Sequence, residues 1–158
     1  MPRKLDEREL VQFGITANHE LMDNGGARFR LAGRDNSSYI RCENTGGPLW
    51  ENSHSHSALQ EMVIVQSGCV VFAEYREGAA RLRALFPGEW AVTIPSVPHN
   101  ECLAPGTVVH TVKFGDCARP DWIASPELDA LTKPLAFGEA LEQASQDHPY
   151  NGWPALTL

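Results

Sequence analysis

The stretch GGPLWENSHSHSALQEMVIVQSG, residues 46–68, is the most informative part of the chain. His54 and His56 stand two residues apart, so on a strand both imidazoles leave the same face. Glu61 follows beside the apolar run MVIV, where an unpaired carboxylate would be costly to bury. Because a metal ion would relieve that cost, this stretch predicts a metal site.

A second segment, PGEWAVTIPSVPHN (residues 87–100), places His99 after a proline-rich turn at the end of a predicted strand. His99 completes a set of three imidazoles and one carboxylate. Such a mixture of nitrogen and oxygen ligands suits Fe(II), Mn, Ni, Co, Cu or Zn far better than Ca or Mg. We therefore expect one divalent first-row transition metal per chain, and the ligand types alone do not choose among these ions.

The first segment resembles the first motif of the cupin superfamily, which reads roughly G-x5-H-x-H-x3-4-E-x6-G. His54, His56, Glu61 and Gly68 match this pattern, while Gly47 lies one residue further back than the pattern asks.

The second segment resembles the second cupin motif, roughly G-x5-P-x-G-x2-H-x3-N. Gly88 and His99 keep the separation that the motif requires. Between and beyond them the chain departs from it, because Ile94 stands at the first proline, Ser96 at the inner glycine and Leu103 at the final asparagine.

The resemblance covers about residues 46–115 and implies an all-β fold, a jelly-roll-like antiparallel barrel with the metal in its interior. It implies that the ligands are His54, His56, Glu61 and His99. It also implies a homodimer.

Short β-rich runs separated by Gly, Pro, Asn and Ser fill residues 27–115, and this texture by itself predicts a sandwich or barrel. We expect residues 1–26 to form an N-terminal arm and residues 116–158 to form a helical extension of the same domain. Within the extension, PELDALTK and PLAFGEALEQASQDH predict two helices, each with a proline near its start. Residues 5–13 fit either a short helix or a strand-like arm.

Alternation within the predicted strands suggests which side chains share a face. In ARFRLAG, Arg28 and Arg30 share one face, opposite the intervening apolar residues. In TVVHTVKFG, His110 shares a face with Val108 and Val112, so we expect it to point into the interior.

The bulk properties exclude several classes of protein. The 158 residues suit one domain, and 13 Lys and Arg against 20 Asp and Glu give a net charge of −7 with no basic cluster, which argues against a nucleic-acid partner. No apolar run approaches the roughly 18 residues of a membrane span, and the N-terminus lacks a secretory signal, so we expect no membrane partner and a cytoplasmic location.

Two residues outside the ligand set are candidates for proton transfer. His110 titrates near neutral pH and is expected inside, although it could instead hold a ligand in orientation. Glu101 lies two residues after His99 and shares its face if the strand continues. The alternative for Glu101 is a carboxylate at the rim, exposed to water.

Three further residues are candidates for a substrate pocket. Trp50 and Trp90 have the size to wall a pocket for a planar or apolar substrate, with core packing as the alternative. Arg41 alternates with Ile40 and Cys42 and could face inward to bind a substrate carboxylate. Its alternative is an exposed charge on a strand.

The cupin resemblance implies three classes of function for a small-molecule substrate. The first, which we favour, is a non-haem Fe(II)-type dioxygenase acting on a small enolisable or hydroxylated compound, and it makes Fe(II) the favoured metal. The second is a redox-free Zn or Mn enzyme, such as a lyase, decarboxylase, isomerase or polyketide cyclase. The third is a ligand-binding protein without turnover, which predicts a pocket whose only titratable groups are the ligands.

Overall fold

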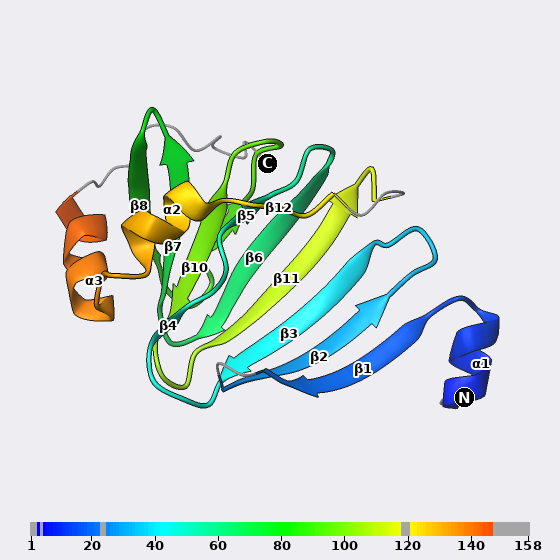
Figure 1. The fold of residues 1–158 in the computed structure, drawn as a ribbon. Helices are drawn as coiled ribbons and strands as arrows, with labels where there is room; N and C mark the ends of the chain where they lie inside the picture. The colour runs from blue at the N-terminus through cyan, green and yellow to red at the C-terminus, as the bar shows by residue number, and fades with distance from the viewer. Residues whose placement is uncertain (1–2, 4, 23–24, 118–120, 147–158) are drawn as a thin grey trace.

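β-Strands are the dominant element of the protein (Figure 1). The computed structural model describes residues 3, 5–22, 25–117 and 121–146. The strands in chain order are β1 (Thr16–Leu21), β2 (Gly26–Ala32), β3 (Ser38–Asn44), β4 (Leu49–Trp50), β5 (His54–Ser55), β6 (Leu59–Ser67), β7 (Val70–Arg76), β8 (Ala79–Leu85), β9 (Trp90–Val92), β10 (His99–Leu103), β11 (Val108–Gly115) and β12 (Ile123–Ala124). The helices are α1 (Glu7–Gln12), α2 (Pro126–Thr132) and α3 (Phe137–Gln146).

These strands pair antiparallel in two sheets. Sheet A has the order β1-β2-β3-β11-β6-β9, and sheet B has the order β12-β5-β10-β7-β8, with β4 added on β10. One apolar cluster joins the inner faces of both sheets, formed by Cys42, Val63, Val65, Val70, Phe72, Leu85, Ala91, Leu103 and Val109. The expected antiparallel β fold with C-terminal helices is therefore confirmed.

The cross-strand register decides which residues of sheet A face the interior. One inward row joins Arg30 on β2, Ile40 on β3 and Thr111 on β11, and the neighbouring row contains Arg28 and Cys42. Strands β2 and β11 thus direct polar side chains between the two sheets.

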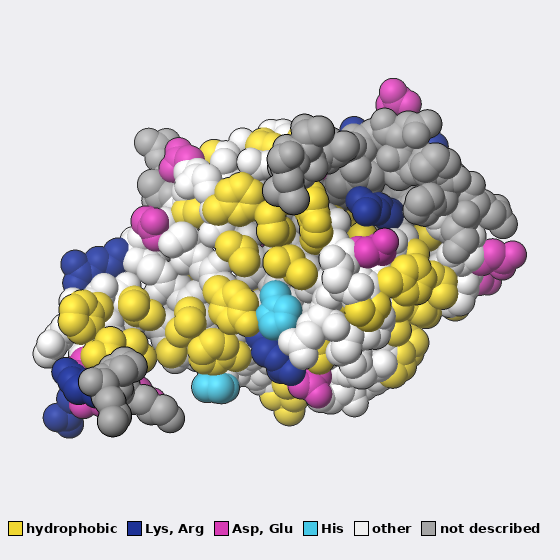
Figure 2. All heavy atoms as spheres, turned by 180° about the vertical axis from the view of Figure 1, so that it is seen from behind, with side chains coloured by type: hydrophobic (Ala, Val, Ile, Leu, Met, Phe, Trp, Pro, Cys, Tyr) yellow, Lys and Arg dark blue, Asp and Glu magenta, His cyan; other side chains and the backbone are white. Residues whose placement is uncertain are grey.

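The outer face of sheet A carries the residues of opposite parity. Two cross-strand rows lie on it, made of Phe29, Arg41, His110, Ile64 and Trp90 and of Leu31, Tyr39, Val112, Met62 and Val92. Figure 2 shows apolar side chains gathered across this side of the molecule. The expectation that His110 points into the interior is wrong, because the inward positions of β11 hold the polar residues Thr111 and Lys113.

The outer face of sheet B is covered by the C-terminal helices. Ser125 caps α2 by accepting a hydrogen bond from the backbone N–H of Leu128, and Pro126 occupies the first turn, where no backbone donor is needed. The second apolar cluster joins these helices to the sheet and contains Trp50, Val71, Ala73, Leu82, Ala84, Cys102, Leu128, Ala140 and Ala144.

The N-terminal segment begins with a helix, one of the two forms expected for residues 5–13. Asp6 and Glu9 form a reciprocal capping box at the start of α1. Strand β1 then pairs with β2 from Thr16 to Leu21, so sheet A begins before residue 27. The tail at residues 147–158, predicted as the end of the helical extension, lies outside the described residues.

Among the helices described, none combines the length and the apolar composition that crossing a bilayer requires.

Candidate metal centre

Three histidines and one glutamate meet between the two sheets, at one wall of the interior. His54 lies on β5 and pairs with His99 at the start of β10, His56 follows β5 directly, and Glu61 faces inward from β6. One ligand atom from each of the four lies within 4.8 Å of the others. The structure thus brings together all four residues that the sequence proposed as ligands.

The second nitrogen of each imidazole is held by an oxygen. The contacts are His54 Nδ1 to the Asn52 carbonyl at 2.9 Å, His56 Nδ1 to Asp121 Oδ1 at 2.9 Å, and His99 Nδ1 to the Val97 carbonyl at 3.3 Å. Since a carbonyl or carboxylate oxygen can only accept, the Nδ1 atoms of His54 and His56 carry the hydrogen and their Nε2 atoms have a free lone pair, while His99 Nε2 lies 2.9 Å from Glu61 Oε2. The lone pairs of His54 and His56 are then available to a cation that lies beside Glu61 and His99.

Two of these Nε2 atoms have no hydrogen-bond partner within the described part of the chain. The Nε2 atoms of His54 and His56 are buried and make no hydrogen bond, although they lie 3.5 and 3.6 Å from the Glu61 carboxylate. Leaving a buried acceptor unsatisfied costs about 1–3 kcal/mol. A divalent cation would take both lone pairs, so the residues present fit a bound metal ion.

The protonation states also suit a metal. Burial opposes the charge of Glu61, but the three neighbouring histidines and the nearby Lys113 outweigh it and hold the pKa of Glu61 far below its usual range. Burial lowers the pKa of His99 despite its contact with Glu61. A carboxylate and a neutral imidazole are the forms that bind metal.

Asp121 fixes one ligand from outside the cluster. Its carboxylate accepts hydrogen bonds from the backbone N–H groups of Ser57 and Ala58, at 2.6 and 2.9 Å, as well as from His56. Burial disfavours the ionised form, but these hydrogen bonds prevail and lower the pKa of Asp121 to about 2. Asp121 therefore stays charged and holds His56 in the tautomer that exposes Nε2.

Aromatic rings enclose the cluster on two sides. Trp122 stacks on His54 with ring centroids 5.3 Å apart, and 53% of its surface is exposed. Phe72 stacks on His99 at 6.1 Å and is fully buried. The turn before His99 has Ser96 at φ 64°, a left-handed conformation that favours the glycine of the cupin motif.

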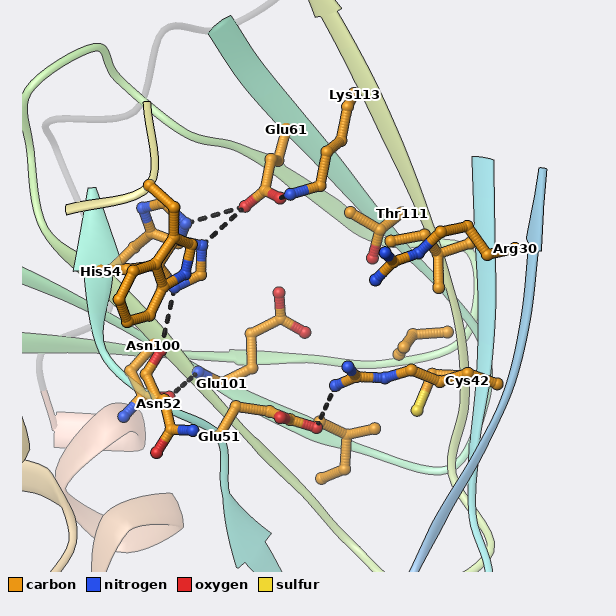
Figure 3. A pocket seen from close by; sticks show the side chains of 16 residues that line it. Arg30, Cys42, Glu51, Asn52, His54, Glu61, Asn100, Glu101, Thr111 and Lys113 are labelled. Carbon is orange, nitrogen blue, oxygen red and sulfur yellow. Dashed lines mark hydrogen bonds and ion pairs between the residues drawn. The ribbon is translucent and has the colours of Figure 1, made fainter. Parts of the chain in front are cut away.

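A cavity of about 240 Å³ opens beside the cluster (Figure 3). His54, Glu61 and His99 line one wall, and Arg28 and Arg30 line the opposite one. Two ion pairs cross or border the cavity, Arg28 to Glu51 at 2.9 Å and Lys113 Nζ to Glu61 Oε1 at 2.5 Å. The volume suits a compound of a few carbon atoms.

Glu101 projects into this cavity, as Figure 3 shows. Its carboxyl group makes no hydrogen bond or ion pair with any residue that the structure describes. Burial, together with the carboxylates of Glu61 and Glu51, raises the pKa of Glu101 to about 8. The cations Arg28 and Lys113 oppose this rise without cancelling it.

The other predicted site residues lie away from the cavity. Trp50 is buried below the C-terminal helices and donates its Nε1–H to the Leu135 carbonyl at 3.1 Å. Arg41 pairs with Glu43, and Trp90 shares the same outward row.

His110 also lies on this outer face. Its Nδ1 is 2.7 Å from the Tyr39 hydroxyl, and its Nε2 is 2.8 Å from Gln66 Oε1. Neither His110 nor Arg41, Trp50 or Trp90 is among the residues that line the cavity.

Several residues of the site were not predicted. The alternation in ARFRLAG places Arg28 and Arg30 on one shared face. This pattern would have predicted two cavity residues if the polar face, rather than the apolar face, had been assigned to the interior. Asp121 lies 65 residues after His56 in the sequence, and neither it nor Trp122 follows a local pattern. They reach the site because the chain returns to pair β12 with β5.

Searches with protein-family models and against curated proteins find no match to this sequence. Solved structures of Bacillus subtilis oxalate decarboxylase are similar to it. One, concerned with the Mn(II) centres of that enzyme, gives a TM-score of 0.56 at 14% identity and covers 68% of this chain. Another structure of an oxalate decarboxylase, concerned with the substrate binding mode and a reaction specificity switch, gives a TM-score of 0.56 at 12% identity and covers 69% of this chain.

These matches cover 30% of the decarboxylase chain, so the similarity concerns a minor part of that protein. At this level of identity it shows the fold. The chain has the cupin fold that its two motifs indicated.

Proposed function

We propose that this cupin-fold protein is a metal-dependent enzyme that acts on a small oxygenated organic compound. The observation that carries the proposal is the convergence of three imidazole Nε2 atoms and Glu61 at the wall of a cavity that also contains a separate carboxyl group, Glu101. Four protein ligands leave one or two positions on a first-row ion for substrate. The third class of function, binding without turnover, predicted no titratable group besides the ligands, and Glu101 counts against it.

His54, His56, Glu61 and His99 would hold the ion. When bound, a divalent ion supplies Lewis-acid stabilisation of negative charge on a substrate oxygen. Asp121 orients His56 through its Nδ1–H, and Lys113 keeps Glu61 ionised through its ammonium group. These contacts order the ligands before substrate arrives.

Glu101 is placed to exchange a proton with the substrate. It faces the cavity from β10, two residues from His99, and no described residue holds its carboxyl group. The cavity that it faces is lined in part by apolar side chains, including Ile40, Leu103 and Val109, which limit the water inside. A protonated carboxyl group in this position can deliver a proton to a carbanion or enolate and can recover one afterwards.

Among the reaction classes, we place the redox-free enzyme first, as a decarboxylase or lyase. Glu101 supplies the proton donor that such a reaction requires. The similar fold belongs to a protein named oxalate decarboxylase, whose Mn(II) centres are the subject of one of the matched structures. The dioxygenase favoured from the sequence is the second candidate, because the same four ligands suit Fe(II).

The metal content of the purified protein tests whether the proposed ligands bind an ion, and which ion they bind. The protein, purified without added ions or chelators, is analysed by elemental mass spectrometry and then assayed with small carboxylic acids for CO₂ release and for oxygen uptake. We expect near-stoichiometric manganese or zinc and turnover without oxygen consumption. Iron with oxygen uptake would establish the dioxygenase instead, and a protein that binds none of these ions would contradict the proposal. The homodimer and the cytoplasmic location stay predictions.

A further inference from the structure

The charged side chains that face the cavity do not all find partners. Arg28 pairs with Glu51 across the two sheets, at 2.9 Å. Lys113 pairs with Glu61. Among the described residues that line the cavity, Arg30 and Glu101 are the cation and the carboxyl group for which no ion pair is found.

Of these two residues, Arg30 more clearly lacks a partner among the described residues. Its Nε atom is buried, and no hydrogen bond reaches it within the described part of the chain. Figure 3 shows the guanidinium group directed from β2 into the cavity beside Thr111 on β11. The two residues occupy one inward row, because Arg30 pairs with Ile40 and Ile40 pairs with Thr111.

Arg30 as a whole is half-buried, and its buried Nε donor has no acceptor among the described residues. Its planar fork of N–H donors matches the two oxygens of a carboxylate, which it binds with two parallel hydrogen bonds. The Thr111 hydroxyl adds a donor to the same wall. The wall is thus complementary to a carboxylate, and none of the described residues supplies one to Arg30.

We propose that Arg30 and Thr111 form a carboxylate subsite, and that the substrate is therefore a small organic acid. Its carboxylate binds on the sheet A wall while another oxygen of the same molecule reaches the His54, His56, Glu61 and His99 cluster. This inference rests on the proposed function for the second contact only. The volume of about 240 Å³ limits the acid to a few carbon atoms.

Dicarboxylates of increasing length test the subsite. Oxalate, malonate and succinate, each beside its neutral diamide, are titrated by calorimetry into the Mn²⁺-loaded and the metal-free protein. The variants are Arg30→Gln, Arg30→Lys and Thr111→Val, with Arg41→Gln as the matched control on the outer face. Metal content and thermal unfolding are measured for every variant.

We expect one dicarboxylate to bind at least tenfold tighter than its diamide. Arg30→Gln should weaken it by about 10- to 100-fold, the range for loss of a charged hydrogen-bonded pair. Arg30→Lys, which keeps the cation, should fall between wild type and Arg30→Gln, Thr111→Val should lose a few fold, and Arg41→Gln should not change binding.

Equal binding to wild type and to a folded Arg30→Gln variant would overturn the subsite, and so would diamides that bind as tightly as the acids. The metal measurement separates this result from failure of the proposed function. A protein that takes up no metal would end the proposed function, yet the dependence of binding on Arg30 in the metal-free protein would still decide the subsite.

Discussion

Side chains alternate between the two faces of sheet A and of sheet B, but the two sheets differ in which face carries the polar residues. On sheet B the outer face is apolar and is covered by α2 and α3, so both faces of β7 are buried and hold Phe72 and Ala73. On sheet A the inward positions of β2 hold Arg28 and Arg30, and the outward positions hold Phe29 and Leu31. An apolar row therefore marks the interior only where the interior is a packed core. Where it is a binding cavity, the polar row faces inward.

The largest expected effect is on turnover, and it distinguishes a residue that faces the cavity from a residue on the outer face of sheet A. Glu101→Gln should lower turnover by about 10² to 10⁴, because the cavity loses its proton donor. His110→Ala should leave turnover within about twofold of wild type, since His110 contacts Tyr39 and Gln66 on the outer face. Both are measured as kcat with the acid found in the metal-dependent assay, at equal metal content. A tenfold loss in His110→Ala would restore that residue to the mechanism.

The next effect is on the free energy of unfolding, and it tests the packing of the C-terminal helices on the outer face of sheet B. Leu128 is completely buried between α2 and the sheet, so Leu128→Ala should lower the free energy of unfolding by about 2–5 kcal/mol. Leu21→Ala on β1 removes the same atoms from a side chain that is 77% exposed and should change it by less than about 0.5 kcal/mol. Urea titrations measure both. Similar losses in the two variants would show that the outer faces are equally covered.

A smaller effect is expected outside the ligand set. Asp121→Asn should weaken metal binding by about 10- to 100-fold, because an amide cannot accept all the hydrogen bonds from His56, Ser57 and Ala58. Competition with a chromophoric chelator measures the affinity. Asp35→Asn, at an exposed turn of sheet A, provides the control. Unchanged affinity in Asp121→Asn would show that His56 is oriented without it.

The smallest effect concerns acid stability on the sheet B side. Burial opposes ionisation of Asp129 on α2, but hydrogen bonds from the Ser53 backbone and from Lys133 outweigh it and lower the pKa of Asp129. A lowered pKa contributes stability that is present above the unfolded-state value, near 3.9, and is lost as the pH falls through the folded-state value.

Asp129→Asn should therefore cost about 0.5–1.5 kcal/mol at pH 7 and should flatten the loss of stability below about pH 4. Thermal unfolding between pH 2.5 and 7 measures both effects. Glu142→Gln, on the exposed side of α3, removes one charge as a control. An Asp129→Asn variant that follows the wild-type acid curve would remove this contact from the stability of α2.

The sequence predicts the parts of the site that depend on local spacing. His54, His56 and Glu61 lie within eight residues of one another, and Glu101 was assigned to the face of His99 by strand alternation alone. The prediction that His110 points into the interior is wrong because it assumes that the apolar face of a strand always points inward.

Arg41 and Trp90 lie on the same outward row as His110, so the same assumption accounts for all three. Trp50 fails for another reason, because the helices that bury it are distant in sequence. Asp121 and Trp122 could not be predicted, since only the pairing of β12 with β5 brings them to the ligands.

The ring of Trp122 lies flat against a proposed ligand while more than half of it meets solvent. An indole in that position is a built-in optical probe of the ion. Paramagnetic ions such as Mn²⁺ or Fe²⁺ bound at His54 would quench its fluorescence, whereas Zn²⁺, with a filled d shell, would leave most of the emission intact. Quenching of the Trp122 emission can thus report a paramagnetic ion at the centre, without a substrate and without a label.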